Sequence, residues 1–227
     1  MFYYHVGMNR TKIFLVTVVA VFCFTTSANA CLAACKEKKR DEAYSKPLTA
    51  ATLQTIVDNA LPQKSVDPEL GEPYQVYPID VKPYDKDFHA TLIEYPYGSS
   101  PRAVTHEPNP RGIILYVHGY NDYFFQEELA EKSDSAGFAF FAIDLHYNGR
   151  SYSEGEPRSD MRSVKEYYAE LDAAIALCKS IAAKGSGAKL PFVILGHSQG
   201  GLITPNYLNE RNSEDFAALV LNSRVSL

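Results

Sequence analysis

After residue 112, the hydrophobic positions of the chain form short unbroken apolar runs that alternate with longer segments of helical periodicity. The apolar runs predict buried strands, and the segments between them predict helices, because their apolar residues recur every three or four positions. Strands that alternate with helices form parallel sheets with helices on both faces. The predicted strands are GIILYV (112–117), FAFFAID (138–144), PFVIL (191–195) and FAALVLN (216–222), with helices over about 123–136, 163–183 and from Ser198 onward.

The predicted helix 163–183 has an apolar pattern that indicates one buried stripe. Its members recur at spacings of three and four, which places them on one side of a helix. Cys178 belongs to this stripe, so we interpret it as a small core residue rather than a reactive thiol. The stripe consists of Val164, Tyr167, Tyr168, Leu171, Ile175, Cys178 and Ile181.

The preceding segment, from Ala43 to about Pro110, is rich in proline and tyrosine and lacks this alternation. Residues 48–61 predict a short helix and residues 88–96 predict a strand. The strand alternates polar and apolar side chains, which predicts antiparallel pairing and one face in water. We interpret the segment as the beginning of the domain that follows, so residues 44–227 are assigned to one domain.

The first 35 residues have the features of an export signal. Arg10 and Lys12 precede an apolar run from Ile13 to Phe24, which is too short to span a bilayer comfortably and is followed by small residues. We therefore assign residues 1–35 to an export signal and exclude them from fold reasoning.

Two cleavage sites fit this signal. Residues 28–30 (ANA) have the small-x-small form of an ordinary signal site, which would yield a secreted or periplasmic protein. Residues 32–35 (LAAC) resemble the bacterial lipobox, whose cysteine becomes lipidated. We favour the lipobox, which makes Cys35 the predicted lipid-attachment site, the membrane surface a predicted partner and the charged residues 36–43 a spacer.

Composition and charge argue against one class of partner. The 227 residues carry a formal net charge of -5, and the body of the chain has no strongly basic block. A nucleic-acid partner is therefore not expected. The cysteine spacing implies no disulfide framework, and no histidine and aspartate cluster has the spacing of a metal site. We expect neither a metal nor another cofactor.

The stretch VILGHSQGGL (193–202) places Ser198 between Gly196 and Gly200, after a predicted strand and before a predicted helix. A serine nucleophile stands on a sharp turn in this context. The two glycines fit because such a turn brings backbones too close for side chains. The start of the helix would point toward Ser198, where its N–H groups favour a developing oxyanion.

A second motif strengthens this interpretation. His118 and Gly119 end the first predicted parallel strand. In serine hydrolases the loop at this place supplies one N–H of the oxyanion hole, and the residue after the nucleophile supplies the other. These positions are Tyr120 and Gln199. Each motif alone fits an ordinary turn, but the two together predict a serine hydrolase site.

Three motifs in order make the chain resemble the α/β-hydrolases, and within them the branch of lysophospholipases, monoacylglycerol lipases and serine aminopeptidases. They are VHGYND (117–122), DLHYNGRS (144–151) and GHSQGG (196–201). The second motif is similar to the branch's Asp-x-Arg-Gly-x-Gly-x-Ser segment, although His146 replaces its arginine and Tyr147 its first glycine. The likeness runs from about residue 87 to residue 222.

The resemblance implies an α/β-hydrolase fold and acyl transfer. Ser198 would attack an ester or amide carbonyl, a histidine would take its proton, and an acid would orient that histidine. The implied substrates are small-molecule or lipid esters. Monoacyl lipid esters are favoured by the branch and by a membrane location.

The histidines of this chain do not follow the family's order, which is Ser, then Asp or Glu, then His. No histidine follows Ser198, and Glu214 and Asp215 come too early for the family's acid. We therefore expect residues 44–227 to be the N-terminal portion of a longer hydrolase. Without base and acid, turnover would fall by roughly 10⁴ to 10⁶. The expected roles of the upstream histidines are structural for His118 and His197, whereas His146 is a candidate substitute base.

Two further functions fit the same residues. A non-catalytic α/β-hydrolase-like binding protein would explain the missing acid and base, and a peptidase acting on N-terminal residues would use the same fold. The sequence leaves acyl-chain length, head group and oligomeric state open. It also predicts an uncovered sheet edge at the last strand, 216–222.

Overall fold

The structure, a computed structural model, describes residues 28–83, 85–102, 107–183, 189–211 and 213–222. Most of the predicted export signal lies outside the described residues. One sheet of seven strands forms the centre of the fold, in the order β1-β2-β3-β5-β4-β6-β7. The strands are β1 (Ser65–Val66), β2 (Gln75–Val81), β3 (Phe88–Tyr95), β4 (Ile113–Val117), β5 (Ala139–Asp144), β6 (Phe192–His197) and β7 (Ala218–Asn222).

The four strands after residue 112 are parallel, as their apolar runs predict. β4 lies between β5 and β6, and β7 pairs with the far side of β6. β1, β2 and β3 pair antiparallel with their neighbours, and β3 joins this half to β5. Val117 of β4 is in register with Gly196 of β6. The carboxyl ends of these two strands therefore meet at one edge, where the two sequence motifs lie.

Helices cover both faces of the sheet, so the predicted α/β-hydrolase architecture is confirmed. One apolar core lies between the sheet and α2, α4 and α5, and the other contains Ala130 of α3 and Phe124. The alternating side chains of β4 and β5 supply both cores, which is why these strands are apolar throughout. The helices are α1 (Ala28–Tyr44), α2 (Ala50–Ala60), α3 (Glu127–Ser135), α4 (Tyr168–Ala182) and α5 (Gly200–Glu210), with short 3-10 turns η1 (Leu61–Gln63), η2 (Gly149–Ser151), η3 (Val164–Tyr167) and η5 (Ser213–Asp215).

One prediction for the N-terminal half is wrong, and one strand was not predicted. β3 does not have one face in water, because Leu92 packs into one core and Ile93 into the other. The antiparallel pairing itself is confirmed. β2 was not predicted at all: Pro78 interrupts its pattern, although Pro78 pairs in register with Thr91 of β3.

Two helix predictions also differ from the structure. α3 begins at Glu127 rather than near residue 123, because the N–H of Phe124 donates to the Asp144 carboxylate at 2.8 Å instead of entering a helix. α4 has no single buried stripe: all residues from Tyr168 to Ile175 are buried. α2 also packs against α4, and Tyr207 of α5 meets Tyr168 of α4 with ring centroids 5.4 Å apart.

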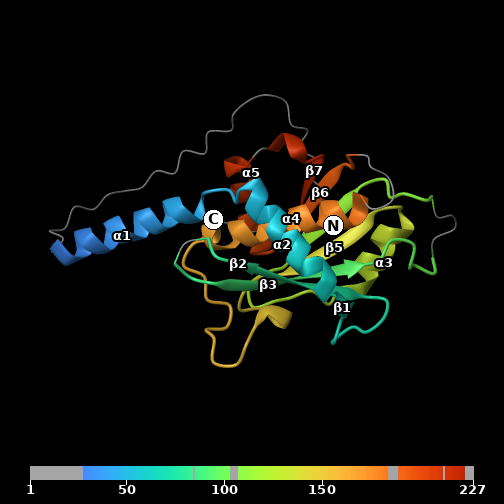
Figure 1. The fold of residues 1–227 in the computed structure, drawn as a ribbon, viewed down its shortest axis with the longest axis horizontal. Coiled ribbons are helices and arrows are strands. Elements are labelled where there is room, and N and C mark those ends of the chain that lie inside the picture. The colour runs from blue at the N-terminus through green and yellow to red at the C-terminus, as the bar shows by residue number, and fades with distance from the viewer. Residues whose placement is uncertain (1–27, 84, 103–106, 184–188, 212, 223–227) are drawn as a thin grey trace.

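α1 projects from the body of the domain as one long helix (Figure 1). Residues 34–39 are exposed, whereas Tyr44 at the end of the helix is buried. The predicted spacer 36–43 is therefore helical and mostly in water. Within the described residues, no helix is both long enough and apolar enough to cross a bilayer.

Candidate active site

Ser198 occupies the turn between β6 and α5, in a left-handed backbone conformation with φ 49°. A β-carbon on Gly196 would lie 2.5 Å from the carbonyl oxygen of Gly200. A β-carbon on Gly200 would lie 2.3 Å from the carbonyl oxygen of Val117. Real side chains do not tolerate such distances, so both glycines are required by close backbone approach. The sharp strand-to-helix turn that the sequence predicts is present.

The loop after β4 packs directly against this turn. A β-carbon on Gly119 would lie 3.1 Å from the Ser198 Cβ, and the Gly119 N–H donates to Asp122 at 3.2 Å. Tyr120 and Gln199 are therefore brought to the same edge of the sheet, one on each turn. Among the backbone hydrogen bonds between described residues, none has the N–H of Tyr120 or Gln199 as its donor. Two N–H groups without a backbone acceptor beside a serine are what an oxyanion hole requires.

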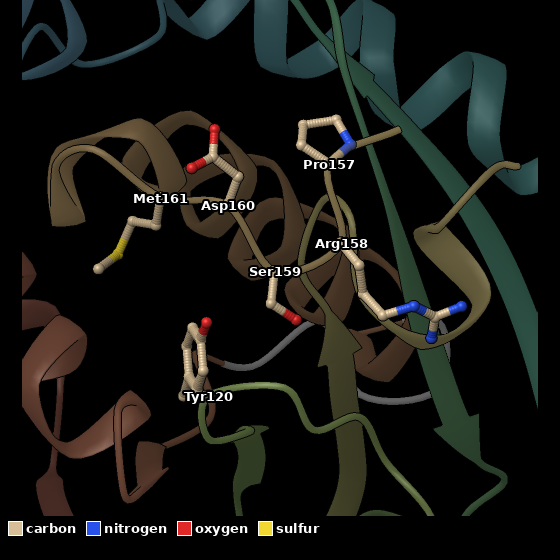
Figure 2. A pocket seen from close by; sticks show the side chains of 6 residues that line it. All are labelled: Tyr120, Pro157, Arg158, Ser159, Asp160 and Met161. Atoms are coloured by element: carbon tan, nitrogen blue, oxygen red, sulfur yellow. The ribbon is translucent and has the colours of Figure 1, made fainter. Parts of the chain in front are cut away.

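A pocket of about 460 Å³ opens beside Tyr120. Tyr120 lies on one side of it and the segment 157–161 on the other (Figure 2). The Gln199 amide reaches the sulfur of Met161 at 3.5 Å, which connects the pocket wall to the turn that carries Ser198. The Tyr120 side chain is 66% exposed and Ser159 is buried. The pocket thus adjoins Tyr120 directly, and Met161 in its wall contacts Gln199.

The DLHYNGRS segment (144–151) supports the loop between β4 and α3 through buried charged groups. The Asp144 carboxylate accepts the N–H groups of Phe124 and Arg150, at 2.8 and 3.0 Å. The Arg150 guanidinium pairs with Asp144 at 2.8 Å and with Asp67 at 2.7 Å. A β-carbon on Gly149 would lie 2.5 Å from the Asp144 carboxylate. These residues hold the loop between β4 and α3 in place and do not themselves face Ser198.

His118 is a structural residue, as its position predicts. It is buried, and its Nδ1 contacts the carbonyl oxygen of Gly119 at 2.7 Å. Its Nε2 accepts the N–H of Leu145 at 3.0 Å, so the neutral ring donates from Nδ1. Burial lowers the pKa of His118, against the opposing effect of nearby Asp144. Because backbone groups use both ring nitrogens, His118 cannot take a proton from Ser198.

His146 is buried in the core of the domain. Its Nδ1 hydrogen-bonds to the Glu170 carboxylate, which also accepts the His146 backbone N–H at 3.0 Å. The ring stacks on Phe88 with centroids 4.1 Å apart and contacts Tyr167. The side chain is 1% exposed. His146 and Glu170 thus form a buried pair at the position where the family carries arginine.

His197 and the cysteines complete the set of residues that the sequence singles out. His197 Nδ1 contacts the carbonyl oxygen of Asn222 at 3.0 Å, and its ring stacks on Tyr116. Cys178 is buried, which raises the pKa of its thiol well above the ordinary value and confirms it as a core residue. Cys35 is an exposed free thiol on the projecting helix α1, and stays a predicted lipid-attachment site. Among the described residues, no three potential ligands gather into a metal site.

The sequence interpretation missed two parts of the site region. Arg150 lies within a quoted motif, but its partner Asp67 is 83 residues earlier, so no local pattern could connect them. Ser159 is buried at φ 55° with exposed neighbours on both sides. The sequence around Ser159 is that of a surface loop, which predicts that its side chain is exposed rather than buried.

The family described as serine aminopeptidase, S33, matches residues 108–224, which is more than half of the chain. A monoacylglycerol lipase of Mycolicibacterium smegmatis is 29% identical over 119 residues, covering 52% of this chain and 39% of that protein. The phospholipase YtpA of Bacillus subtilis is 28% identical over 115 residues, covering 50% of this chain and 40% of that protein. The chain thus spans about two fifths of the length of the curated relatives it matches.

Solved structures of two esterases are also similar. A carboxyl esterase from Bacillus coagulans matches 64% of this chain and 43% of its own, with 18% identity and a TM-score of 0.49. A variant of the Saccharomyces cerevisiae monoglyceride lipase matches over 62% of this chain and 42% of that chain, with 19% identity and a TM-score of 0.47. The fold assignment rests on the strand order and on the family match.

Proposed function

The chain belongs to the serine aminopeptidase S33 family of hydrolases, and from that membership we propose that it cleaves carboxylic esters through an acyl-enzyme on Ser198. The family resemblance predicted from the three motifs is confirmed. The observation that carries the proposal is the left-handed turn at Ser198, packed against Gly119 of the preceding loop. A non-glycine residue in this conformation is uncommon and marks functional turns.

The proposed chemistry uses the geometry of the two turns. Ser198 Oγ forms a bond to the ester carbonyl carbon, and the carbonyl oxygen takes up the negative charge. The N–H groups of Tyr120 and Gln199 stabilise that oxygen, together with the start of α5. The bond between that carbon and the alkoxy oxygen then breaks, and the alcohol leaves with the proton that Ser198 Oγ gives up. Water next attacks the acyl carbon; its oxygen stays with the acid, and one of its protons returns to Ser198 Oγ as the carbon–Oγ bond breaks. An oxyanion-hole donor of this kind contributes about 10² to 10³ in rate.

The proposed substrates are monoacyl lipid esters, of the lysophospholipid or monoacylglycerol type. Support comes from the names of the relatives, a monoacylglycerol lipase and a phospholipase. The pocket beside Tyr120 has room for a small head group or a segment of acyl chain. A peptidase function, suggested by the family description, is the alternative with the same nucleophile.

We propose that the chain as printed turns esters over weakly. His118 has both ring nitrogens engaged, His146 is buried against Glu170, and His197 contacts the carbonyl oxygen of Asn222. Among the described residues, none of these three histidines is hydrogen-bonded to Ser198. The same observation favours the second candidate function, a binding protein of α/β-hydrolase fold without turnover.

Labelling with a fluorophosphonate probe tests the nucleophile. The probe forms a Ser198 Oγ–phosphorus bond with loss of fluoride, and intact mass and peptide mapping locate the adduct. We expect a single adduct on Ser198, absent from Ser198→Ala and retained in Ser153→Ala, whose side chain is exposed. An unlabelled chain, or equal labelling of Ser198→Ala, would contradict the proposal. Monoacylglycerols, lysophospholipids and aminoacyl anilides, assayed side by side, separate esterase from peptidase activity.

We also propose that the protein is exported and anchored to a bacterial membrane through a lipid on Cys35. The exposure of Cys35 on α1, away from the body of the domain, supports this proposal (Figure 1). Expression in a bacterium fed radiolabelled palmitate should label the wild-type chain and not Cys35→Ala. Equal labelling of both would place the lipid on another residue and contradict the role of Cys35, whereas labelling of neither would argue for a secreted or periplasmic protein instead.

A further inference from the structure

The carbonyl oxygen of Asn222, at the end of β7, accepts two hydrogen bonds from the turn that carries the proposed nucleophile. The backbone N–H of Ser198 donates to it at 3.1 Å, and the Nδ1 of His197 lies 3.0 Å from it. Because a carbonyl oxygen can only accept, the His197 Nδ1 carries a proton and donates it. The side chain of His197 and the backbone of Ser198 therefore share one acceptor.

The hydrogen bond of the Ser198 N–H bears directly on the left-handed backbone of this residue, with φ 49°. This angle is the rotation about the bond between the Ser198 nitrogen and its Cα, so it is measured against the peptide plane that contains the N–H. A hydrogen bond at the N–H fixes that plane. A non-glycine residue keeps this conformation only when its surroundings hold it there, so the Asn222 carbonyl helps to maintain the turn.

Asn222 is exposed, and it pairs with His197 as the last described pair between β6 and β7. Backbone hydrogen bonds at the exposed end of a strand open easily, because water competes for them. The half-buried side chain of His197 supplies a second donor to this carbonyl oxygen, in addition to the N–H of Ser198. The end of β7 is thus tied to both residues of the turn.

The His197 ring also borders the loop that carries Tyr120, a proposed oxyanion-hole donor. A β-carbon on Gly119 would lie 3.5 Å from the His197 Cδ2 and 3.1 Å from the Ser198 Cβ. The backbone of Gly119 therefore packs against both residues at once. The ring of Tyr116, on β4, lies nearly parallel to the imidazole, with centroids 6.5 Å apart. His197 thus has neighbours on β7, on β4 and on the loop that follows β4.

We propose that His197 is a positioning residue for the nucleophile. By donating to the Asn222 carbonyl oxygen it fixes the acceptor of the Ser198 N–H, and with it the left-handed turn from which Ser198 Oγ attacks. His197 acts through Asn222 and does not touch the reacting atoms. The inference rests on the proposed function, in which Ser198 is the nucleophile. It gives a role in the reaction to a histidine for which the sequence predicts only a structural role.

The test uses the full chain and a p-nitrophenyl alkylphosphonate. Ser198 Oγ forms a bond to phosphorus while the bond from phosphorus to the aryl oxygen breaks; p-nitrophenolate leaves, and the Oγ proton passes to the buffer. The absorbance of p-nitrophenolate, followed over a range of probe concentrations, gives the dissociation constant of the probe and the rate constant of the step separately.

Three variants, checked for folding by circular dichroism, separate the hydrogen bond from the packing. His197→Phe keeps a ring beside Tyr116 and has no donor. His197→Asn keeps a donor, because its amide N–H can take the place of Nδ1. His89→Phe is the matched control, since His89 is an exposed histidine on β3.

We expect His197→Phe to lower the rate constant by about tenfold or more at an unchanged dissociation constant, because a misplaced nucleophile loses rate rather than binding. His197→Asn should recover most of this loss, and His89→Phe should match the wild type. Should His197→Phe fail to fold, the wild-type chain decides. The side-chain ¹⁵N chemical shifts of its histidines, measured at alkaline pH where the rings are neutral, should show the proton of His197 on Nδ1.

The results that would overturn the inference differ from those that would overturn the proposed function. A wild-type rate constant in His197→Phe, or a rate constant in His197→Asn as low as in His197→Phe, would show that the donated hydrogen bond does not position Ser198. A neutral His197 ring with its proton on Nε2 would disprove the hydrogen bond itself. These results would leave the proposed function intact, whereas a wild-type chain without any adduct on Ser198 would overturn the proposed function, and this inference with it.

Discussion

Gly200 packs so closely beneath the end of β4 that a β-carbon on it would lie 2.3 Å from the carbonyl oxygen of Val117. This contact joins the turn that carries Ser198 to the strand that carries the oxyanion loop. The relative position of the two turns is therefore determined by backbone atoms. Both parts are rigid, because Val117 is paired with β5 on one side and β6 on the other, and Gly200 begins α5.

Replacing Gly200 by alanine should destabilise the protein by about 3 kcal/mol, since the added methyl group must displace backbone rather than a flexible side chain. Gly201→Ala is the matched control. A β-carbon there meets nothing closer than 3.7 Å, and alanine in a helix gains about 0.5–1 kcal/mol over glycine. Urea unfolding of both variants measures the difference. Similar stabilities for the two would contradict the close contact.

The buried Arg150 should be among the most costly residues to remove. Its guanidinium pairs with Asp144 and Asp67, and its side chain is 4% exposed. Arg150→Met leaves two buried carboxylates uncompensated, so we expect a loss of about 3–5 kcal/mol in the free energy of unfolding. Arg102→Met breaks an exposed pair with Glu131 and should change stability by less than about 1 kcal/mol. Equal effects in thermal or urea unfolding would exclude the proposed support role.

His118 should make stability depend on pH in the weakly acidic range. Burial lowers its pKa in the folded state below the ordinary 6.5. The unfolded chain therefore binds a proton first as pH falls through 6.5, and the folded state loses stability from there down to the lowered pKa. One such group contributes at most about 1.4 kcal/mol per pH unit.

The measurement is urea unfolding between pH 7.5 and 5 for the wild type and for His118→Gln. The variant removes the titration, so its stability should fall less steeply over this interval. His89→Gln is the control, since His89 lies exposed on β3. Parallel pH profiles for wild type and His118→Gln would disprove the assignment.

The two cysteines whose side chains are described should differ strongly in reactivity. Cys178 is buried and its thiol pKa is raised, so little thiolate is present and no reagent reaches it. Cys35 is exposed. Peptide mapping after brief iodoacetamide treatment of the non-lipidated chain should find Cys35 modified and Cys178 protected, at least 100-fold by order of magnitude. Modification of Cys178 before unfolding would contradict its core position.

The local patterns of the sequence were sufficient for the second half of the fold. Apolar runs in β4 to β7 identify parallel strands, and β4 and β5 have no polar alternation because each supplies residues to the cores on both faces. In the first half of the fold, the same hydrophobic patterns did not predict the strands correctly. β2 contains a proline, and the apolar residues of β3 point into two cores, one on each side of the strand, so its alternation does not mark a face in water.

The sequence by itself determined that Ser198 lies on a sharp turn between a strand and a helix, because glycine spacing and apolar periodicity are local properties of the chain. Only the tertiary structure decided what surrounds that turn. The contact of Gly200 with Val117 and the pairing of Arg150 with Asp67 join residues distant in sequence. Such contacts depend on the register and crossover of strands, which no short segment encodes alone. The same is true of the histidines, whose availability as bases depends on packing partners rather than on their position in the chain.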